Sequence, residues 1–111
     1  MLQHRGGGFV AGLAPRVSPI LLLIRDVATG DPEVKALRDE VDTDRLARMT
    51  KNARRLREAG HLRPGISLAQ AADILWTYSA PELYELLVLR WGWSAERYGR
   101  YVADAMACAL L

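Results

Sequence analysis

The chain has 111 residues, half of them hydrophobic and a quarter charged, which is typical of one ordinary globular domain. Its formal net charge of +2 excludes a strong field over the whole chain that would attract nucleic acid or an anionic membrane. The single cysteine, Cys108, excludes an internal disulfide and fits a reducing cytoplasm, and the longest aliphatic run, residues 20–24, is too short to span a bilayer.

The first predicted element is a helix that follows a glycine-rich start. We interpret residues 1–12 as a flexible or truncated start and residues 13–111 as the folded domain. The first helix is expected from about Ser18 to Thr29, because Ser18 is a favourable N-cap and Pro19 suits the first turn.

The next two helices have clear capping signals. Asp31 and Pro32 predict the start of a long helix that Gly60 closes. Ser67 and Gln70 form the pattern of a capping box, which predicts a third, mostly buried helix as far as about Tyr78.

The last two predicted helices lie close together in the sequence. Ser79 and Glu82 repeat the capping-box pattern and predict a fourth helix to about Trp91, which Gly92 ends. Ser94 then caps a fifth helix that runs to the end of the chain. No segment has the alternating pattern of a strand, so we expect an all-α, five-helix domain whose last two helices form an antiparallel hairpin.

Both helices of this hairpin carry more apolar surface than one core needs. We therefore expect two hairpins to pair about a two-fold axis as a four-helix bundle. The alternative is that both apolar stripes are buried within one chain. The residues predicted at the dimer interface are Tyr84, Leu87, Val88, Trp91, Gly99, Ala103, Met106 and Leu110.

The second half of the long helix is rich in cations, from Arg45 to Arg57. One interpretation is a stripe that binds phosphate, and the other is a solvated face whose charges favour the negative end of the helix. We favour the solvated face, because no aromatic residues alternate with these cations and Asp39 to Asp44 lie just upstream.

The sequence offers nothing for catalysis or for a metal. His4 and His61 have no acidic or cysteine neighbours at the spacing of a metal site, and Cys108 has no histidine placed to activate it. We therefore predict no enzymatic activity, no catalytic residue, no metal and no cofactor.

Several segments in order resemble the C-terminal end of TetR-family transcriptional repressors. They are Ala72-Ala-Asp-Ile-Leu-Trp-Thr, Pro81-Glu-Leu-Tyr, Trp91-Gly-Trp-Ser and Glu96-Arg-Tyr, together with residues 19–33 and Gly60-His-Leu-Arg-Pro-Gly. The resemblance implies a ligand-sensing and dimerisation domain whose last two helices form the dimer. The family's helix-turn-helix is absent, so we expect no sequence-specific DNA binding by this chain.

With this resemblance, a mixed set of residues on the first three helices is expected to line a pocket for a small apolar ligand. Methionine adapts to varied apolar ligands, and a few polar groups would fix the ligand's orientation. The predicted ligand-binding residues are Ser18, Leu22, Arg25, Met49, Asn52 and Trp76. The alternative is an interaction module that senses no ligand and pairs with itself or with a full-length relative.

Overall fold

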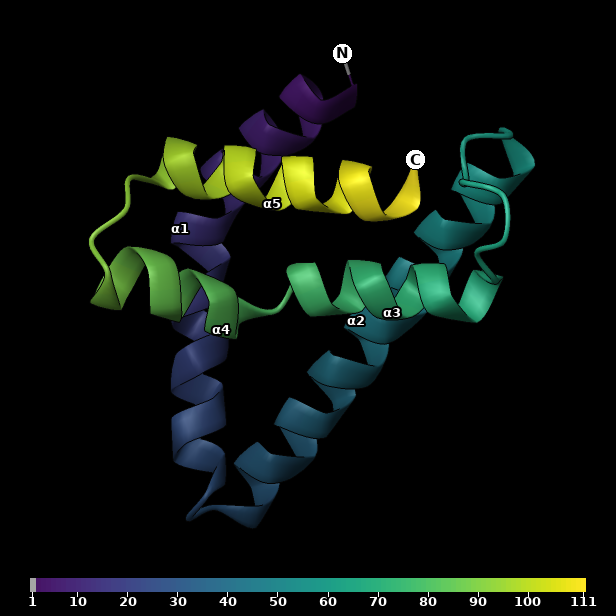
Figure 1. Ribbon diagram of the computed structural model, residues 1–111. Coiled ribbons are helices and arrows are strands. Elements are labelled where there is room, and N and C mark those ends of the chain that lie inside the picture. Colours follow the sequence, from purple (N-terminus) through teal and green to yellow (C-terminus); the bar gives the residue numbers. More distant parts are fainter. Residues whose placement is uncertain (1) are drawn as a thin grey trace.

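The computed structural model describes the backbone from Leu2 to Leu111 and the side chains from Pro15 onward. The described residues are mostly helical and include no strand, which confirms the all-α class. The molecule extends 44 × 29 × 18 Å and is therefore flat. In Figure 1, α1 and α2 diverge from a tight turn, while α3, α4 and α5 cross them as a second layer.

Helix α1 runs over Leu2–Ala28, so it begins well before the predicted start at Ser18. Pro15 and Pro19 both lie inside it, and each lacks the N–H that a helix interior uses. Ser18 is therefore a buried helical residue and not an N-cap. We attribute this to tertiary packing: α5 lies across α1 and stabilises a helix that its own sequence signals would interrupt. Whether residues 1–12 form a separate start of the chain stays a prediction.

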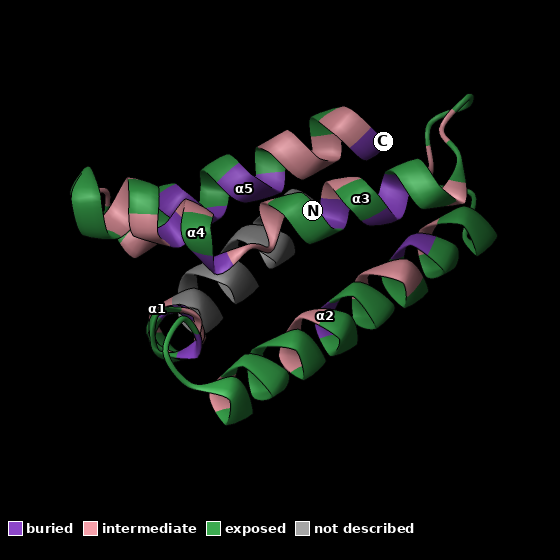
Figure 2. Ribbon diagram, turned by 90° about the horizontal axis from the view of Figure 1, so that it is seen from below, coloured by how far each residue is buried: buried purple, intermediate pink, exposed green. Residues whose placement is uncertain are grey.

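Helix α2, Pro32–Glu58, begins and ends as predicted. The Asp31 carboxylate accepts hydrogen bonds from the backbone N–H groups of Glu33 and Val34. At the other end, Gly60 has a φ of 74°, a left-handed conformation that glycine adopts without strain. One side of α2 packs on α3, and most of its remaining surface is exposed (Figure 2).

Helix α3, Leu68–Tyr78, has the predicted capping box in full. The Ser67 hydroxyl accepts from the Gln70 N–H, and the Gln70 side chain accepts from the Ser67 N–H. Both ends of the helix match the sequence pattern. The prediction that it is mostly buried is wrong: only Ala71, Ala72 and Leu75 are buried, and five of its eleven residues are exposed, because α2 and α5 cover one side of it.

The next helical segment starts one residue later than predicted. Helix α4 covers Pro81–Tyr84 with Ala80 as an N-cap that has no side-chain bond, and it continues directly into η1, Glu85–Arg90, which is π-helical. Ser79 does not cap α4, because its hydroxyl donates to the Trp76 carbonyl oxygen at 3.1 Å and so closes α3.

Helix α5, Ala95–Leu110, is capped by Ser94 as predicted and runs back alongside η1, α4 and α3 (Figure 1). It completes two hydrophobic cores that share the partly buried Met106. The first core joins α2, α3 and the end of α5 around the buried residues Ala53, Ala71, Ala72, Leu75 and Leu110. The second core joins α4 and α5 around the buried residues Tyr84, Tyr98 and Val102.

Candidate functional site

The six residues predicted to bind a ligand fall into two separate groups. On α1, Ser18 and Leu22 are buried and Arg25 takes part in ion pairs. The other three residues, Met49, Asn52 and Trp76, lie on the packed pair α2 and α3.

Each member of the second group has a different environment. Met49 packs on the first core, and Asn52 is exposed. The Trp76 side chain is 37 % exposed and is covered on one face by Arg45. Packing between α2 and α3 explains Met49 and Trp76, and a ligand pocket there stays a prediction.

Arg25 joins α1 to the start of η1. Its guanidinium donates two hydrogen bonds to the Glu85 carboxylate, at 3.1 and 2.9 Å, in a paired geometry. It also donates to Asp26, and a Glu82 oxygen lies 3.8 Å away. The hydrogen bond from Arg25 lowers the pKa of Glu85. The hydrogen bonds that Arg25 donates, with the larger effect from Glu85 and the smaller from Asp26, raise the pKa of Arg25.

Arg45 is another residue that the sequence analysis placed wrongly. It is not on the solvated face of α2: only 8 % of it is exposed, and its guanidinium donates to the Trp76 carbonyl oxygen and, at 2.6 Å, to the Ser79 hydroxyl. Burial lowers its pKa from the usual value. The signal for this role was its spacing, since Arg45 shares a helical face with Val41 and Met49, which are both partly buried.

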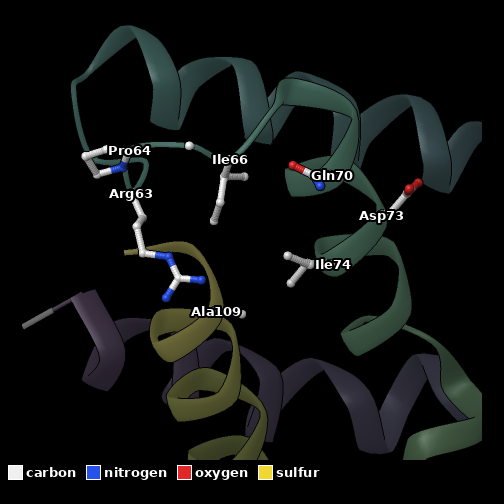
Figure 3. A pocket seen from close by; sticks show the side chains of 8 residues that line it. Arg63, Pro64, Ile66, Gln70, Asp73, Ile74 and Ala109 are labelled. Carbon is white, nitrogen blue, oxygen red and sulfur yellow. The ribbon is translucent and has the colours of Figure 1, made fainter.

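A cleft opens beside the loop after α2. It has a volume of about 560 Å³ and lies between this loop, α3 and the end of α5 (Figure 3). The backbone N–H of Arg63 donates to the Leu110 carbonyl oxygen at 2.7 Å, which fixes the loop against α5. The residues that line the cleft are Arg63, Pro64, Gly65, Ile66, Gln70, Asp73, Ile74 and Ala109.

This cleft combines an apolar interior with polar groups at its rim. Ile66 and Ile74 approach each other from the loop and from α3, while Arg63 and Asp73 stand at opposite sides (Figure 3). Its volume falls in the range of small-molecule sites. None of the six residues predicted to bind a ligand lines it, because the prediction placed the pocket on the side of α3 that carries Trp76.

Half of the residues predicted at a dimer interface are buried within the single chain. Tyr84 and Tyr98 meet edge to face with ring centres 5.5 Å apart, and burial, with a smaller contribution from Tyr84, raises the pKa of Tyr98 to about 12. The chain itself therefore covers Tyr84, Gly99, Ala103 and Leu110.

The other four predicted interface residues keep some exposure. Leu87 and Val88 pack partly on the second core, and Met106 packs on both cores. Trp91, at the end of η1, is 76 % exposed. Two neighbours that the sequence analysis did not assign to the interface, Leu86 and Leu89, are 49 % and 56 % exposed. Exposed apolar side chains thus lie at η1 and its C-terminal end, and also along α1, where Ile20, Leu23 and Val27 are 59 %, 62 % and 45 % exposed.

The described residues hold no group of three or more His, Cys, Asp or Glu side chains that fits a metal ion. From Leu2 to Leu111, no helix has both the length and the apolar character needed to cross a membrane. In comparisons with known proteins, no family model, no curated protein and no solved structure matches this chain significantly.

Proposed function

We propose that this chain is a dimerisation module, equivalent to the C-terminal half of a TetR-like regulator. In this proposal α4 and η1 act as one helix, which gives five helices in all, and they pair with α5 across a two-fold axis as a four-helix bundle. The kinship rests on the sequence resemblance. The free Cys108 supports a reducing, cytoplasmic location.

The observation that carries the proposal is the apolar surface at η1. Leu86, Leu89 and Trp91 lie within six consecutive residues, and they are 49 %, 56 % and 76 % exposed. A tryptophan side chain alone can bury about 150–250 Å², and clustered exposed apolar side chains of this size mark interfaces. We name these three residues the η1 patch.

The proposed interface differs from the sequence-based one in its composition. Tyr84, Gly99, Ala103 and Leu110 already pack within the chain, so they support the hairpin's shape from inside. The partly exposed Leu87 and Val88 extend the η1 patch towards the second core. The surface offered to a second copy is therefore η1 and its C-terminal end.

Light scattering of the purified chain tests the proposal. We expect a dimer at tens of micromolar, and we expect Leu89→Arg to shift it to a monomer, because the arginine would be desolvated without a partner. The matched control is Leu37→Arg on α2, where the leucine is 45 % exposed, and it should leave the dimer intact. A monomeric wild-type chain, or equal effects of both variants, would contradict the proposal.

Ligand sensing is a second candidate function, and the cleft beside Arg63 is the observation that favours it. A planar aromatic or polycyclic ligand with one or two polar groups would contact Ile66 and Ile74 and reach the charged groups at the rim. Energy transfer from Trp76, on the other side of α3, to a bound dye reports binding once Trp91 and Trp93 are changed to Phe.

A panel of hydrophobic dyes would be titrated against this reporter and against the same protein with Ile74→Glu. Loss of the signal with Ile74→Glu places the ligand in the cleft. A signal that survives Ile74→Glu but is lost with Asn52→Arg places it instead in the pocket predicted from the sequence. If no dye binds, the interaction module without a ligand is the better description.

A further inference from the structure

We propose that the second half of α2 carries a surface that binds the phosphate backbone of a double-stranded nucleic acid without reading its sequence. The surface consists of Arg48, Lys51, Arg54, Arg55 and Arg57, and we name it the α2 basic ridge. All five residues are exposed. The interaction does not depend on the η1 patch.

Three of the ridge residues form one row of charge. Arg48, Lys51 and Arg55 follow the spacing i, i+3, i+7 and so lie in one row along the helix, whereas Arg57 lies on the opposite side of the helix from Arg48. Residues 48–58 contain one acidic residue, Glu58, against the five ridge cations. The net charge of the whole chain is nevertheless low, because six acidic residues in residues 31–44 balance these cations.

No ridge residue takes part in an ion pair in the described part of the chain. The ion pairs among the side chains from residue 15 onward join Arg25 or Arg38 to acidic partners. Asp44 and Glu58 lie four residues from Arg48 and Arg54, but neither forms such a pair. Cations three and four residues apart on a helix repel each other, so this arrangement costs the isolated chain stability. A bound polyanion would remove that repulsion.

The helix dipole explains only part of the pattern. Cations near a helix C-terminus are favourable within about the last turn, and the ridge residues of α2's last turn are Arg55 and Arg57. Arg48 and Lys51 lie farther upstream, where this effect has faded. Their presence in the same row needs another explanation, which phosphate binding supplies.

The chemistry of the ridge favours a duplex over other polyanions. Most of its cations are arginines, whose planar guanidinium matches a phosphate with two hydrogen bonds. Residues 45–66 contain no Phe, Tyr or Trp on which single-stranded bases would stack. An anionic membrane fits less well, because Met49 and Leu56, the large apolar residues within 48–58, pack on the first core and are not free to insert.

The ridge is not expected to distinguish one nucleotide sequence from another. Specific readout needs side chains placed on base edges in a groove, whereas contacts to phosphates only position a protein on the duplex. The ridge is therefore expected to bind any duplex, and to do so more weakly as salt rises. This agrees with the prediction that the chain alone has no preferred operator.

Fluorescence anisotropy with labelled 20-base-pair duplexes of random sequence tests the inference, with DNA and RNA duplexes in parallel. We expect both to bind, and if about three phosphates are neutralised, raising salt from about 50 to about 200 mM should weaken binding about 40-fold. The combined variant Arg48→Gln, Lys51→Gln, Arg55→Gln should reduce both affinity and salt dependence, with affinity down at least about tenfold.

The matched control removes three exposed cations outside the ridge, as Lys35→Gln, Arg90→Gln, Arg100→Gln. It changes the net charge equally and should leave most of the affinity intact. Equal losses in the two variants, no duplex binding at about 50 mM salt, or tighter binding to vesicles with phosphatidylserine than to either duplex would overturn the inference. Leu89→Arg should retain the salt dependence measured per chain, which separates this result from dimerisation.

Discussion

The guanidinium of Arg45 lies 4.7 Å from the centre of the Trp76 ring and also donates a hydrogen bond to the backbone carbonyl oxygen of Trp76. The Arg45 side chain, on α2, thus contacts both the ring face of Trp76 and the C-terminal end of α3. It reaches the Ser79 hydroxyl as well, so it fixes the point where the chain turns from α3 into α4. We conclude that Arg45 determines how α2 packs on the second layer.

Replacing Arg45 should therefore destabilise the fold. We expect Arg45→Met to lower the free energy of unfolding by about 2 kcal/mol, because the partly buried Trp76 carbonyl and Ser79 hydroxyl lose a charged donor. Arg45→Lys should recover only part of this, since an ammonium cannot reproduce the planar stack. Urea unfolding measures the change. Arg48→Met, at an exposed position three residues on, should stay within about 0.5 kcal/mol of wild type.

Ala103 distinguishes packing within the chain from packing between chains. The sequence places it at the dimer interface, where an arginine would only separate two folded subunits. In the structure 6 % of Ala103 is exposed within one chain, so Ala103→Arg should unfold the monomer and not merely dissociate it. Circular dichroism at low concentration, with Leu89→Arg as the folded monomeric comparison, separates the two. A well-folded Ala103→Arg monomer would contradict this packing.

The ion pair of Arg25 and Glu85 should make the free energy of unfolding depend on pH in the acidic range. Its hydrogen bonds lower the folded-state pKa of Glu85, so the stabilisation is present above the unfolded-state pKa of about 4.3 and is lost as the pH falls through the lower folded value. Glu85→Gln should be less stable than wild type at neutral pH and should lose less stability on acidification. Urea unfolding between about pH 6 and pH 3 tests this.

The control for this pair is Glu82→Gln. The Glu82 oxygen lies 3.8 Å from the Arg25 guanidinium, and its side chain is 52 % exposed, so it contributes little. Its acid dependence should match that of wild type. If Glu82→Gln and Glu85→Gln behave alike, the link between α1 and η1 is weaker than the bidentate geometry indicates.

The sequence predicted those parts of the fold that local chemistry determines. Asp31, Ser67 and Ser94 are caps because their side chains bond to backbone N–H groups within three residues, and such bonds need no tertiary information. Ser18 and Ser79 have the same local signals but are not N-caps. Because α1 packs against α5, the α1 helix continues through Ser18 instead of starting there. Ser79 instead accepts a hydrogen bond at the end of α3 from Arg45, which is 34 positions away in the sequence.

The candidate sites were harder to predict for the same reason. Whether an apolar side chain on α5 faces its own chain or a second copy depends on which helix crosses it, and Gly99 and Ala103 are covered by their own chain. The cleft brings together residues 63–66, α3 and Ala109, which are separated by up to 46 positions in the sequence. Neither the packing partner of α5 nor the set of residues around the cleft follows a periodic pattern that can be read from the sequence.

Tyr98 should make the protein sensitive to alkali. It is 2 % exposed, and burial raises the pKa of its phenol to about 12, compared with about 10 in the unfolded chain. A raised pKa means that the folded state holds the proton more tightly. The resulting stabilisation is present in full below pH 10 and is lost as the pH rises towards about 12. The loss from this residue should be on the order of 2–3 kcal/mol.

Urea unfolding at pH values between 9 and 12, compared for wild type and Tyr98→Phe, measures this contribution. Tyr98→Phe keeps the ring that packs edge to face on Tyr84 but cannot ionise, so its stability should fall less steeply over that range. Absorbance of tyrosinate should show one group fewer titrating late in the variant. The matched control is Tyr101→Phe, where 46 % of the residue is exposed, and it should follow the wild-type curve. If Tyr98→Phe follows that curve too, the phenol is better hydrated than its burial between α4 and α5 implies.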